Sequence, residues 1–286
     1  MDVSIIIINY NTCQMTSECV DSIIEHTSGV LYEIILVDNA SKDGSKEFFE
    51  KDKRVHYIYN EKNLGFGAAN NIGMKVAKGK YLFLLNSDTL LQNNAIKEFF
   101  DYAESQNDLA CYGCYLVDKT GKLNFPASYF PRFTIKEFLK DTFCHRDYEY
   151  NPTKSMDVQC VCGADMFFNK SIFDKTGGFD EHIFMYGEEC ELQFRMKQQE
   201  VKRMLVPGPQ ILHFGGGSLQ NMVEIKISKI NRYQSHFYIL KKHMFPLTYN
   251  LARLYYIFVV TALYLPKAIF KDKKYLIPIK QIFIRI

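Results

Sequence analysis

The first hundred residues alternate between short apolar runs and longer segments in which apolar and polar positions recur at helical spacing. Val3 to Ile8 is an apolar, β-branched run, which is typical of a strand buried on both faces. Similar runs recur further along, and helical periodicity follows them. The predicted strands are 3–8, 33–37, 55–59 and 81–85, and the main predicted helices are 14–26, 66–77 and 92–104. This alternation predicts parallel β-α-β units in a layered α/β sheet.

The pattern becomes less regular after residue 105. Strand-like pieces near 109–117, 157–168 and 203–213 predict a mixed sheet that completes the same domain, and an aromatic stretch fills 125–152. From Asn221 onward the chain is predicted to be helical. We therefore expect one α/β domain over residues 1–220, followed by a helical extension over 221–286.

The helical extension is both apolar and basic. Leu254 to Pro266 is a run of 13 uncharged residues, which as a helix spans about 20 Å and is too short for a hydrocarbon core of about 30 Å. Residues 241–286 carry nine Lys or Arg and one acid, Asp272; their charge of +8 leaves −5 for the rest of a chain whose total is +3. The segment is predicted to lie at an anionic membrane surface. The alternative is a helix that packs on the catalytic body.

The N-terminus and the cysteines indicate a cytoplasmic protein. Met1-Asp2 leads straight into a strand without the basic flank of a signal peptide. The eight cysteines are scattered, so reduced thiols are expected rather than a disulfide framework. Cys111 with Cys114, and Cys160 with Cys162, lie in apolar contexts whose spacing matches no common zinc pattern, which favours buried thiols.

Candidate chemistry lies where predicted strands end. Asn86-Ser87-Asp88 follows an apolar strand, and Asp38 follows another. Ligands of open α/β sheets bind at this edge, and oxygen donors there suit a hard divalent cation and a diphosphate. Each residue alone is also a common turn former. Glu188-Glu189 opens a predicted helix that ends near Lys197, and His213 follows a third apolar run.

Together with their flanks, these residues resemble glycosyltransferase family 2, the inverting enzymes of GT-A fold. The resemblance covers roughly residues 3–218 and rests on five ordered motifs. These are the opening strand 4–11, the segment Ile34 to Ser45, the glycine- and asparagine-rich loop Asn63 to Gly73, Asn86-Ser87-Asp88, and the stretch from Gly177 to Leu192. Asn86 stands where the family usually has the first acid of Asp-x-Asp, and this exchange resembles the rhamnosyltransferase-like branch. Glu189 stands where the family often has Asp.

The resemblance implies a GT-A-type layered fold with a mixed, largely parallel sheet, and it implies a role for each matching residue. Asp88 and His213 are the expected ligands of Mn²⁺ or Mg²⁺. Glu189 is the expected general base, with Glu188 as the alternative base or a positioning residue, and Asp180 is expected to bind the acceptor. The expected nucleotide and donor contacts are Asn9, Tyr10, Asn11, Asp38, Asn70, Asn71, Asn86 and Ser87. Asp38 can accept a hydrogen bond from the imide N–H of uracil or thymine.

The expected function is transfer of a sugar from a UDP- or dTDP-sugar, with dTDP-rhamnose as one candidate, to a glycan or polyprenyl-linked acceptor in surface polysaccharide synthesis. The expected partners are these substrates and the membrane surface. Nucleic acid is not expected as a partner, and the oligomeric state stays open. A dehydrogenase is disfavoured because Gly65 and Gly67 lack a third glycine and follow the third strand. A nucleotidyltransferase would need a basic glycine-rich loop after the first strand. The remaining alternative is a nucleotide-sugar-binding or nucleotidyltransferase-type α/β protein without sugar-transferase activity.

Overall fold

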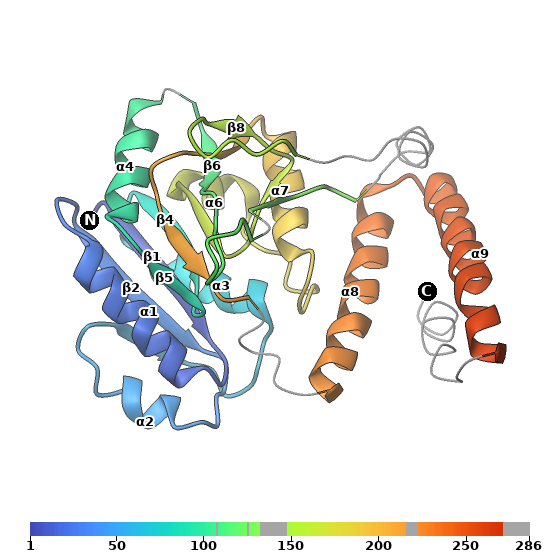
Figure 1. The fold of residues 1–286 in the computed structure, drawn as a ribbon, viewed down its shortest axis with the longest axis horizontal. Helices are drawn as coiled ribbons and strands as arrows, with labels where there is room; N and C mark the ends of the chain where they lie inside the picture. The colour runs from blue at the N-terminus through green and yellow to red at the C-terminus, as the bar shows by residue number, and fades with distance from the viewer. Residues whose placement is uncertain (107, 125, 132–147, 216–221, 271–286) are drawn as a thin grey trace. The chain divides into compact units, whose positions relative to one another are not determined.

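The computed structural model describes residues 1–106, 108–124, 126–131, 148–215 and 222–270. The chain divides into two compact units (Figure 1). Unit 1 comprises Met1–Phe130, Glu149–Phe184 and Glu188–Asn221, and unit 2 comprises Pro131–Tyr148, Met185–Gly187 and Met222–Ile286. The short segment Met185–Gly187 therefore groups with the C-terminal helices, although it lies within the sequence of the first unit.

An eight-stranded sheet in the order β3-β2-β1-β4-β10-β6-β11-β8 is the framework of unit 1. Neighbours from β3 to β4 are parallel, as are β6 and β11, whereas β10 runs antiparallel to both of its neighbours and β8 runs antiparallel to β11. The strands of this sheet are β1 (Val3–Asn9), β2 (Tyr32–Asp38), β3 (His56–Tyr59), β4 (Tyr81–Asn86), β6 (Ala110–Gly113), β8 (Met156–Asp157), β10 (Asp165–Asn169) and β11 (Lys202–Leu205). The predicted mixed, mostly parallel sheet is confirmed.

Helices cover both faces of this sheet because successive side chains of a strand point to opposite sides. Ile5 and Ile7 of β1 belong to the apolar cluster that includes Ile23 of α1 (Cys13–His26) and Phe99 of α4 (Ala95–Ser105). Ile6 points the other way, toward α3 (Phe66–Val76), where a Cβ on Gly73 would meet Ile6 Cγ2 at 2.6 Å. The continuous apolar run that predicted a fully buried strand is therefore explained by two helical layers.

The second half of unit 1 contains shorter elements than the sequence predicts. The remaining strands are β5 (Thr89–Leu91), β7 (Ala127–Ser128), β9 (Cys160–Val161) and β12 (Ile211–His213), paired as β5 with β12 and β7 with β9. The remaining helices of this unit are α2 (Ser45–Phe49), α6 (Lys170–Thr176) and α7 (Glu188–Gln198). The predicted strand over 203–213 is two strands in two different sheets, and 157–168 is divided among β8, β9 and β10.

Unit 2 contains the predicted helical extension, as α8 (Met222–His243) and α9 (Pro246–Phe270). The apolar run Leu254 to Pro266 lies within α9. Within the described residues, none of the helices combines the length and apolar character that a membrane crossing needs. The basic residues predicted to flank this run from position 271 onward lie outside the described residues.

Candidate active site at the carboxyl edge of the sheet

Asn9 and Asp38, the last residues of β1 and β2, form the buried floor of the site. They are paired in the parallel register, and neither is exposed to solvent. The Asn9 amide donates to Asp38 Oδ2 at 2.9 Å, while its Oδ1 accepts from the hydroxyls of Thr12 at 2.8 Å and Thr16 at 3.0 Å. Thr12 is the N-cap residue of α1, but its hydroxyl makes no capping hydrogen bond because it donates to Asn9.

The Asp38 carboxylate is occupied within the protein. Its Oδ1 accepts from the backbone N–H of Ser41 at 2.7 Å, and its Oδ2 accepts from Asn9. A hydrogen bond to a nucleotide base would need an exposed oxygen, and Asp38 has none in this structure. Its observed contacts favour a role in shaping the loop after β2, and direct contact with the base stays a prediction.

The loops after β1 and β2 hold each other in an unusual backbone conformation. Asn11 and Ala40 have positive φ angles of 54° and 66°, which L-residues adopt rarely. The Asn11 backbone N–H donates to the Ser41 hydroxyl at 2.9 Å, and the Asn11 side chain accepts from the Lys42 N–H at 2.7 Å. The side chain of Tyr10, the residue before Asn11, is exposed. The paired loops therefore present Tyr10 and the backbone of Asn11 at the edge where a nucleotide is expected.

Asp88 and His213 meet because β5 pairs with β12. Thr89 lies opposite His213 in this ribbon, and the Phe214 N–H donates to the Asp88 carbonyl at 3.0 Å. Asp88 Oδ1 lies 3.4 Å from His213 Nε2. The two predicted metal ligands are thus brought together from distant parts of the sequence. Among the described residues no set of three or more acidic, His or Cys side chains is arranged to hold a metal ion, so this pair would need further ligands from a substrate or water.

Neighbouring polar residues connect this pair to the rest of the site. Asn86 is the last residue of β4, and its N–H donates to the Ala164 carbonyl at 3.0 Å. The Ser87 hydroxyl lies 3.1 Å from the Thr12 hydroxyl. The side chain of Asn124, a residue that sequence reasoning missed, donates to the His213 carbonyl at 2.7 Å. The metal pair is therefore joined to the β1 loop on one side and to the start of β10 on the other.

The two glutamates at the start of α7 have different environments. Glu188 is 5% exposed, and its Oε2 has no hydrogen-bond partner among the described residues. Burial, together with the charge of Glu189, raises the pKa of Glu188 well above its ordinary value. Glu189 is more exposed, and its Cβ lies 3.5 Å from the position that a Cβ on Gly163 would take. Because Gly163 precedes Ala164, which binds Asn86, Glu189 lies at the same edge as the end of β4.

The segment Thr176–Glu181, which contains Asp180, is held from both sides. Asn71 of α3 donates to the Phe179 carbonyl at 2.9 Å and accepts from the Phe179 N–H at 2.8 Å. Arg195 of α7 donates to the carbonyls of Thr176 and Gly178, and Glu191 accepts from the same guanidinium. The Asn71 amide is thus engaged by this segment, and these contacts favour a structural role over the predicted contact with the donor.

Two further predicted residues are placed by local contacts. Asp180 Oδ1 accepts from the His182 backbone N–H at 3.0 Å and lies 3.0 Å from His182 Nδ1. Asn70 donates to the Phe66 carbonyl at 3.0 Å, while its Oδ1 is buried without a partner among the described residues. Asn70 therefore retains an unused acceptor, whereas Asp180 is already paired.

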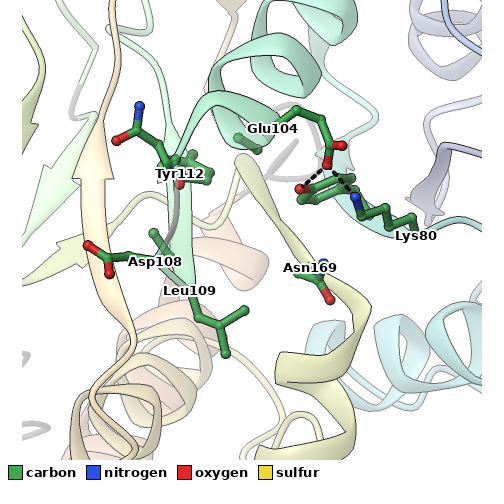
Figure 2. Close-up of a pocket in the computed structure, with 10 residues that line it drawn as sticks. Lys80, Glu104, Asp108, Leu109, Tyr112 and Asn169 are labelled. Atoms are coloured by element: carbon green, nitrogen blue, oxygen red, sulfur yellow. Dashed lines mark hydrogen bonds and ion pairs between the residues drawn. The ribbon is translucent and has the colours of Figure 1, made fainter.

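A separate pocket lies at the opposite edge of the sheet, and Figure 2 shows the side chains that line it. Its lining includes Tyr81 at the start of β4 and Asn169 at the end of β10. The Lys80 ammonium and the Tyr81 hydroxyl both donate to Glu104 Oε1, at 2.5 and 2.6 Å. None of the predicted site residues lines it. Glu104 is thus paired with Lys80 and Tyr81. Because the lining contains no predicted site residue, the pocket is separate from the site predicted from sequence.

Solved structures define the class of fold. The chain superimposes on GalNAc-T7, crystallised with UDP, GalNAc and Mn²⁺, with a TM-score of 0.62, 19% identity and coverage of 82% of this chain and 47% of that one. It superimposes on S. aureus TarS with a TM-score of 0.56, 14% identity and coverage of 83% and 44%. At these identities the likeness concerns the fold alone, which is the GT-A fold of glycosyltransferases.

Sequence comparison then gives the family. The Glycosyl transferase family 2 profile matches residues 4–177, more than half of the chain. The glycosyltransferase GlyG of Streptococcus pneumoniae is 28% identical over 64% of this chain and 64% of its own length. An uncharacterized glycosyltransferase of Haemophilus influenzae is 34% identical over 66% and 60%. The chain belongs to glycosyl transferase family 2. The matches cover less than two thirds of the length of these relatives.

Proposed function

We propose that the chain is an inverting glycosyltransferase that moves a sugar from a nucleoside-diphosphate donor to a hydroxyl group of an acceptor. One arrangement carries this proposal. Asp88 and His213 lie close together at the carboxyl edge of the sheet. Glu189 lies at the same edge, because it is near Gly163 and the next residue, Ala164, binds Asn86. A diphosphate-binding pair close to a carboxylate suits the displacement of a nucleotide by a hydroxyl group.

The proposed reaction is a displacement at the anomeric carbon in which each of these residues has a separate role. The acceptor oxygen forms a bond to the anomeric carbon, while the bond from that carbon to the diphosphate oxygen breaks and the nucleotide leaves with the electron pair. Glu189 removes the proton of the attacking hydroxyl. Glu188, whose pKa burial raises well above its ordinary value, is the alternative base or a positioning residue next to Glu189. Asp180 is proposed to orient the acceptor.

The Asp88 and His213 side chains fit a divalent cation. A carboxylate oxygen and an imidazole nitrogen 3.4 Å apart can share one ion. Mg²⁺ prefers oxygen ligands alone, whereas Mn²⁺ also accepts imidazole, so this pair favours Mn²⁺. When bound, such an ion neutralises charge on the departing diphosphate. Asn86 and Ser87 are proposed to contact the donor, as are Tyr10 and Asn11.

The donor and the acceptor are proposed from one sequence motif and from the family. The Asn86-Ser87-Asp88 triplet favours the rhamnosyltransferase-like branch, which makes dTDP-rhamnose a candidate beside UDP-sugars. A glycan or polyprenyl-linked acceptor, and with it a role in surface polysaccharide synthesis, is proposed from the family. The competing proposal is a protein that binds nucleotide sugars, or transfers nucleotides, without transferring sugar.

A donor panel with Mn²⁺, Mg²⁺ or chelator tests the function. Release of nucleoside diphosphate together with a glycosylated product is expected, with Glu189→Gln inactive. Donor binding by thermal shift without any turnover would favour the competing proposal, and neither binding nor turnover would reject both.

We also infer that α9 binds a membrane surface. Its exposed apolar side chains recur at helical spacing of three and four: Leu247, Leu251, Leu254 and Phe258. Phe258 is 71% exposed, and the net charge of +8 over residues 241–286 suits anionic lipid. Such a surface suits an enzyme whose acceptor is anchored in lipid.

Vesicle co-sedimentation tests this inference. Binding to vesicles with phosphatidylglycerol is expected to exceed binding to phosphatidylcholine alone and to fall several-fold in Phe258→Glu. Leu31→Glu places the same charge on an exposed leucine of unit 1 and serves as the matched control. Equal loss in both variants, or no binding by the native chain, would contradict it.

A further inference from the structure

The backbone immediately before the proposed general base is strained. Tyr186 and Gly187 have φ angles of 71° and 94°, and α7 begins at the next residue, Glu188. Glycine tolerates this region, but a tyrosine adopts it rarely and only with backbone strain. Such a conformation persists only where the surrounding structure imposes it. The contacts of Met185–Gly187 therefore bear on how the residues just before α7 are held.

One face of α8 supplies these contacts within unit 2. The Ser235 hydroxyl donates to the Met185 carbonyl at 3.0 Å, and Ser235 is buried. The Arg232 guanidinium lies 4.9 Å from the centroid of the Tyr186 ring, a cation–π distance. A Cβ on Gly187 would meet Ile239 Cδ1 at 3.1 Å. Positions 232, 235 and 239 are three and four residues apart, so they lie on one side of the helix.

The position of this segment bears directly on the chemistry. Met185 to Gly187 continues covalently into Glu188 and Glu189, so a change of φ at Tyr186 or Gly187 turns the first residues of α7. A general base works only within hydrogen-bond reach of the proton that it removes, and a misplacement of about 1 Å can cost about 100-fold in rate. The sequence connects the strained segment to the base by two peptide bonds.

We propose that α8 is a positioning element of the active site, in which Arg232 and Ser235 hold Met185–Gly187 and thereby place Glu189 against the acceptor hydroxyl. The assignment of Glu189 rests on the function proposed above, whereas the contacts of α8 do not. Arg232 and Ser235 are positioning residues, because they act through the backbone that leads to Glu189. The C-terminal extension then has two roles, since α8 serves the catalytic site while α9 carries the exposed apolar stripe.

Hydrogen exchange on the full chain tests the positioning independently of activity. In Arg232→Ala/Ser235→Ala, the amides of residues 185–190 are expected to exchange at least tenfold faster, while those of β1 are unchanged. Lys46→Ala/Ser105→Ala is the matched control, because it removes a cation–π contact to Tyr59 and a serine-to-carbonyl hydrogen bond elsewhere. Unchanged exchange at 185–190 would overturn the proposal, whatever the activity of the protein.

Steady-state kinetics then tests the consequence for catalysis. The double variant is expected to lose at least tenfold in kcat with the donor KM within twofold, and its pH–rate profile is expected to shift at the acidic limb. Arg232→Lys, which keeps the cation, is expected to recover most of the rate. A loss no larger than that of the control would overturn the catalytic part. A native chain without transferase activity would reject the proposed function and, with it, the role of Glu189, but would leave the exchange result standing.

Discussion

Asp88 Oδ1 lies 3.4 Å from His213 Nε2, across the two-stranded ribbon in which Thr89 is paired with His213 itself. Both side chains are mostly buried, with exposed fractions of 10% and 13%. Burial of a carboxylate is costly unless a partner compensates it. The pairing of β5 with β12 therefore brings together the two proposed metal ligands.

Removal of the Asp88 charge should strongly reduce turnover in the presence of Mn²⁺. Asp88→Asn keeps the shape but loses the charge, and we expect kcat/KM to fall by about 10²–10³, the range found when one electrostatic donor is removed from an active site. His213→Ala should lose less and should require a higher Mn²⁺ concentration for half-maximal rate. Initial rates against Mn²⁺ concentration measure both effects. Asp101→Asn, an exposed aspartate on α4, is the control, and activity of Asp88→Asn equal to that control would contradict the assignment.

The two glutamates of α7 should respond differently to the same substitution. Glu189→Gln removes the proposed base and should lower kcat by about 10²–10⁴. Glu188→Gln replaces a buried side chain whose raised pKa favours the protonated form, which glutamine resembles in shape, so most of the rate should remain. Single-turnover rates from pH 5 to 9 separate the two. A larger loss in Glu188→Gln than in Glu189→Gln would exchange their roles and make Glu188 the base.

Asn9→Ala should destabilise the fold as well as the donor site. The amide of Asn9 connects Asp38 with the hydroxyls of Thr12 and Thr16, and all of these groups are buried. Its removal leaves polar atoms without partners, at about 1–3 kcal/mol for each. We expect the free energy of unfolding in urea to fall by about 2–4 kcal/mol. Asn250→Ala, an exposed amide on α9, should change it little. Equal stability of the two variants would show that the network is dispensable.

The sequence predicted the elements around the site better than their contacts. The β-branched run from Val3 and the triplet at Asn86 are local patterns, and strand ends of a parallel sheet necessarily meet at one edge. The pairing of β5 with β12 was not predictable, because three-residue strands carry no periodicity. Asn71 lies in a motif that predicted donor contact, yet its amide binds Phe179. Ser235 gave no signal, since its partner is a backbone carbonyl far away in sequence.

Asp165 should make the stability of the protein fall as pH rises. It is fully buried at the start of β10, and burial raises its pKa well above the ordinary value, although the Cys114 N–H donates to Oδ2 at 2.6 Å. Between the ordinary pKa and the raised one, the folded state keeps a proton that the unfolded state has lost. The contribution of Asp165 to the free energy of unfolding is therefore fully present below the ordinary carboxyl pKa. It decreases with rising pH until the raised pKa is passed.

Asp165→Asn isolates this effect, because asparagine is neutral at every pH. We expect the free energy of unfolding of the variant to rise relative to that of the native protein between pH 4 and pH 8. At pH 8 it should be the larger by on the order of 1 kcal/mol. Urea unfolding at several pH values measures the difference, and comparison with the native chain cancels the other carboxylates. Asp108→Asn, an exposed aspartate, should show no such trend. If the free energy of unfolding of the native protein instead rises relative to that of Asp165→Asn with pH, Asp165 is charged in the folded state.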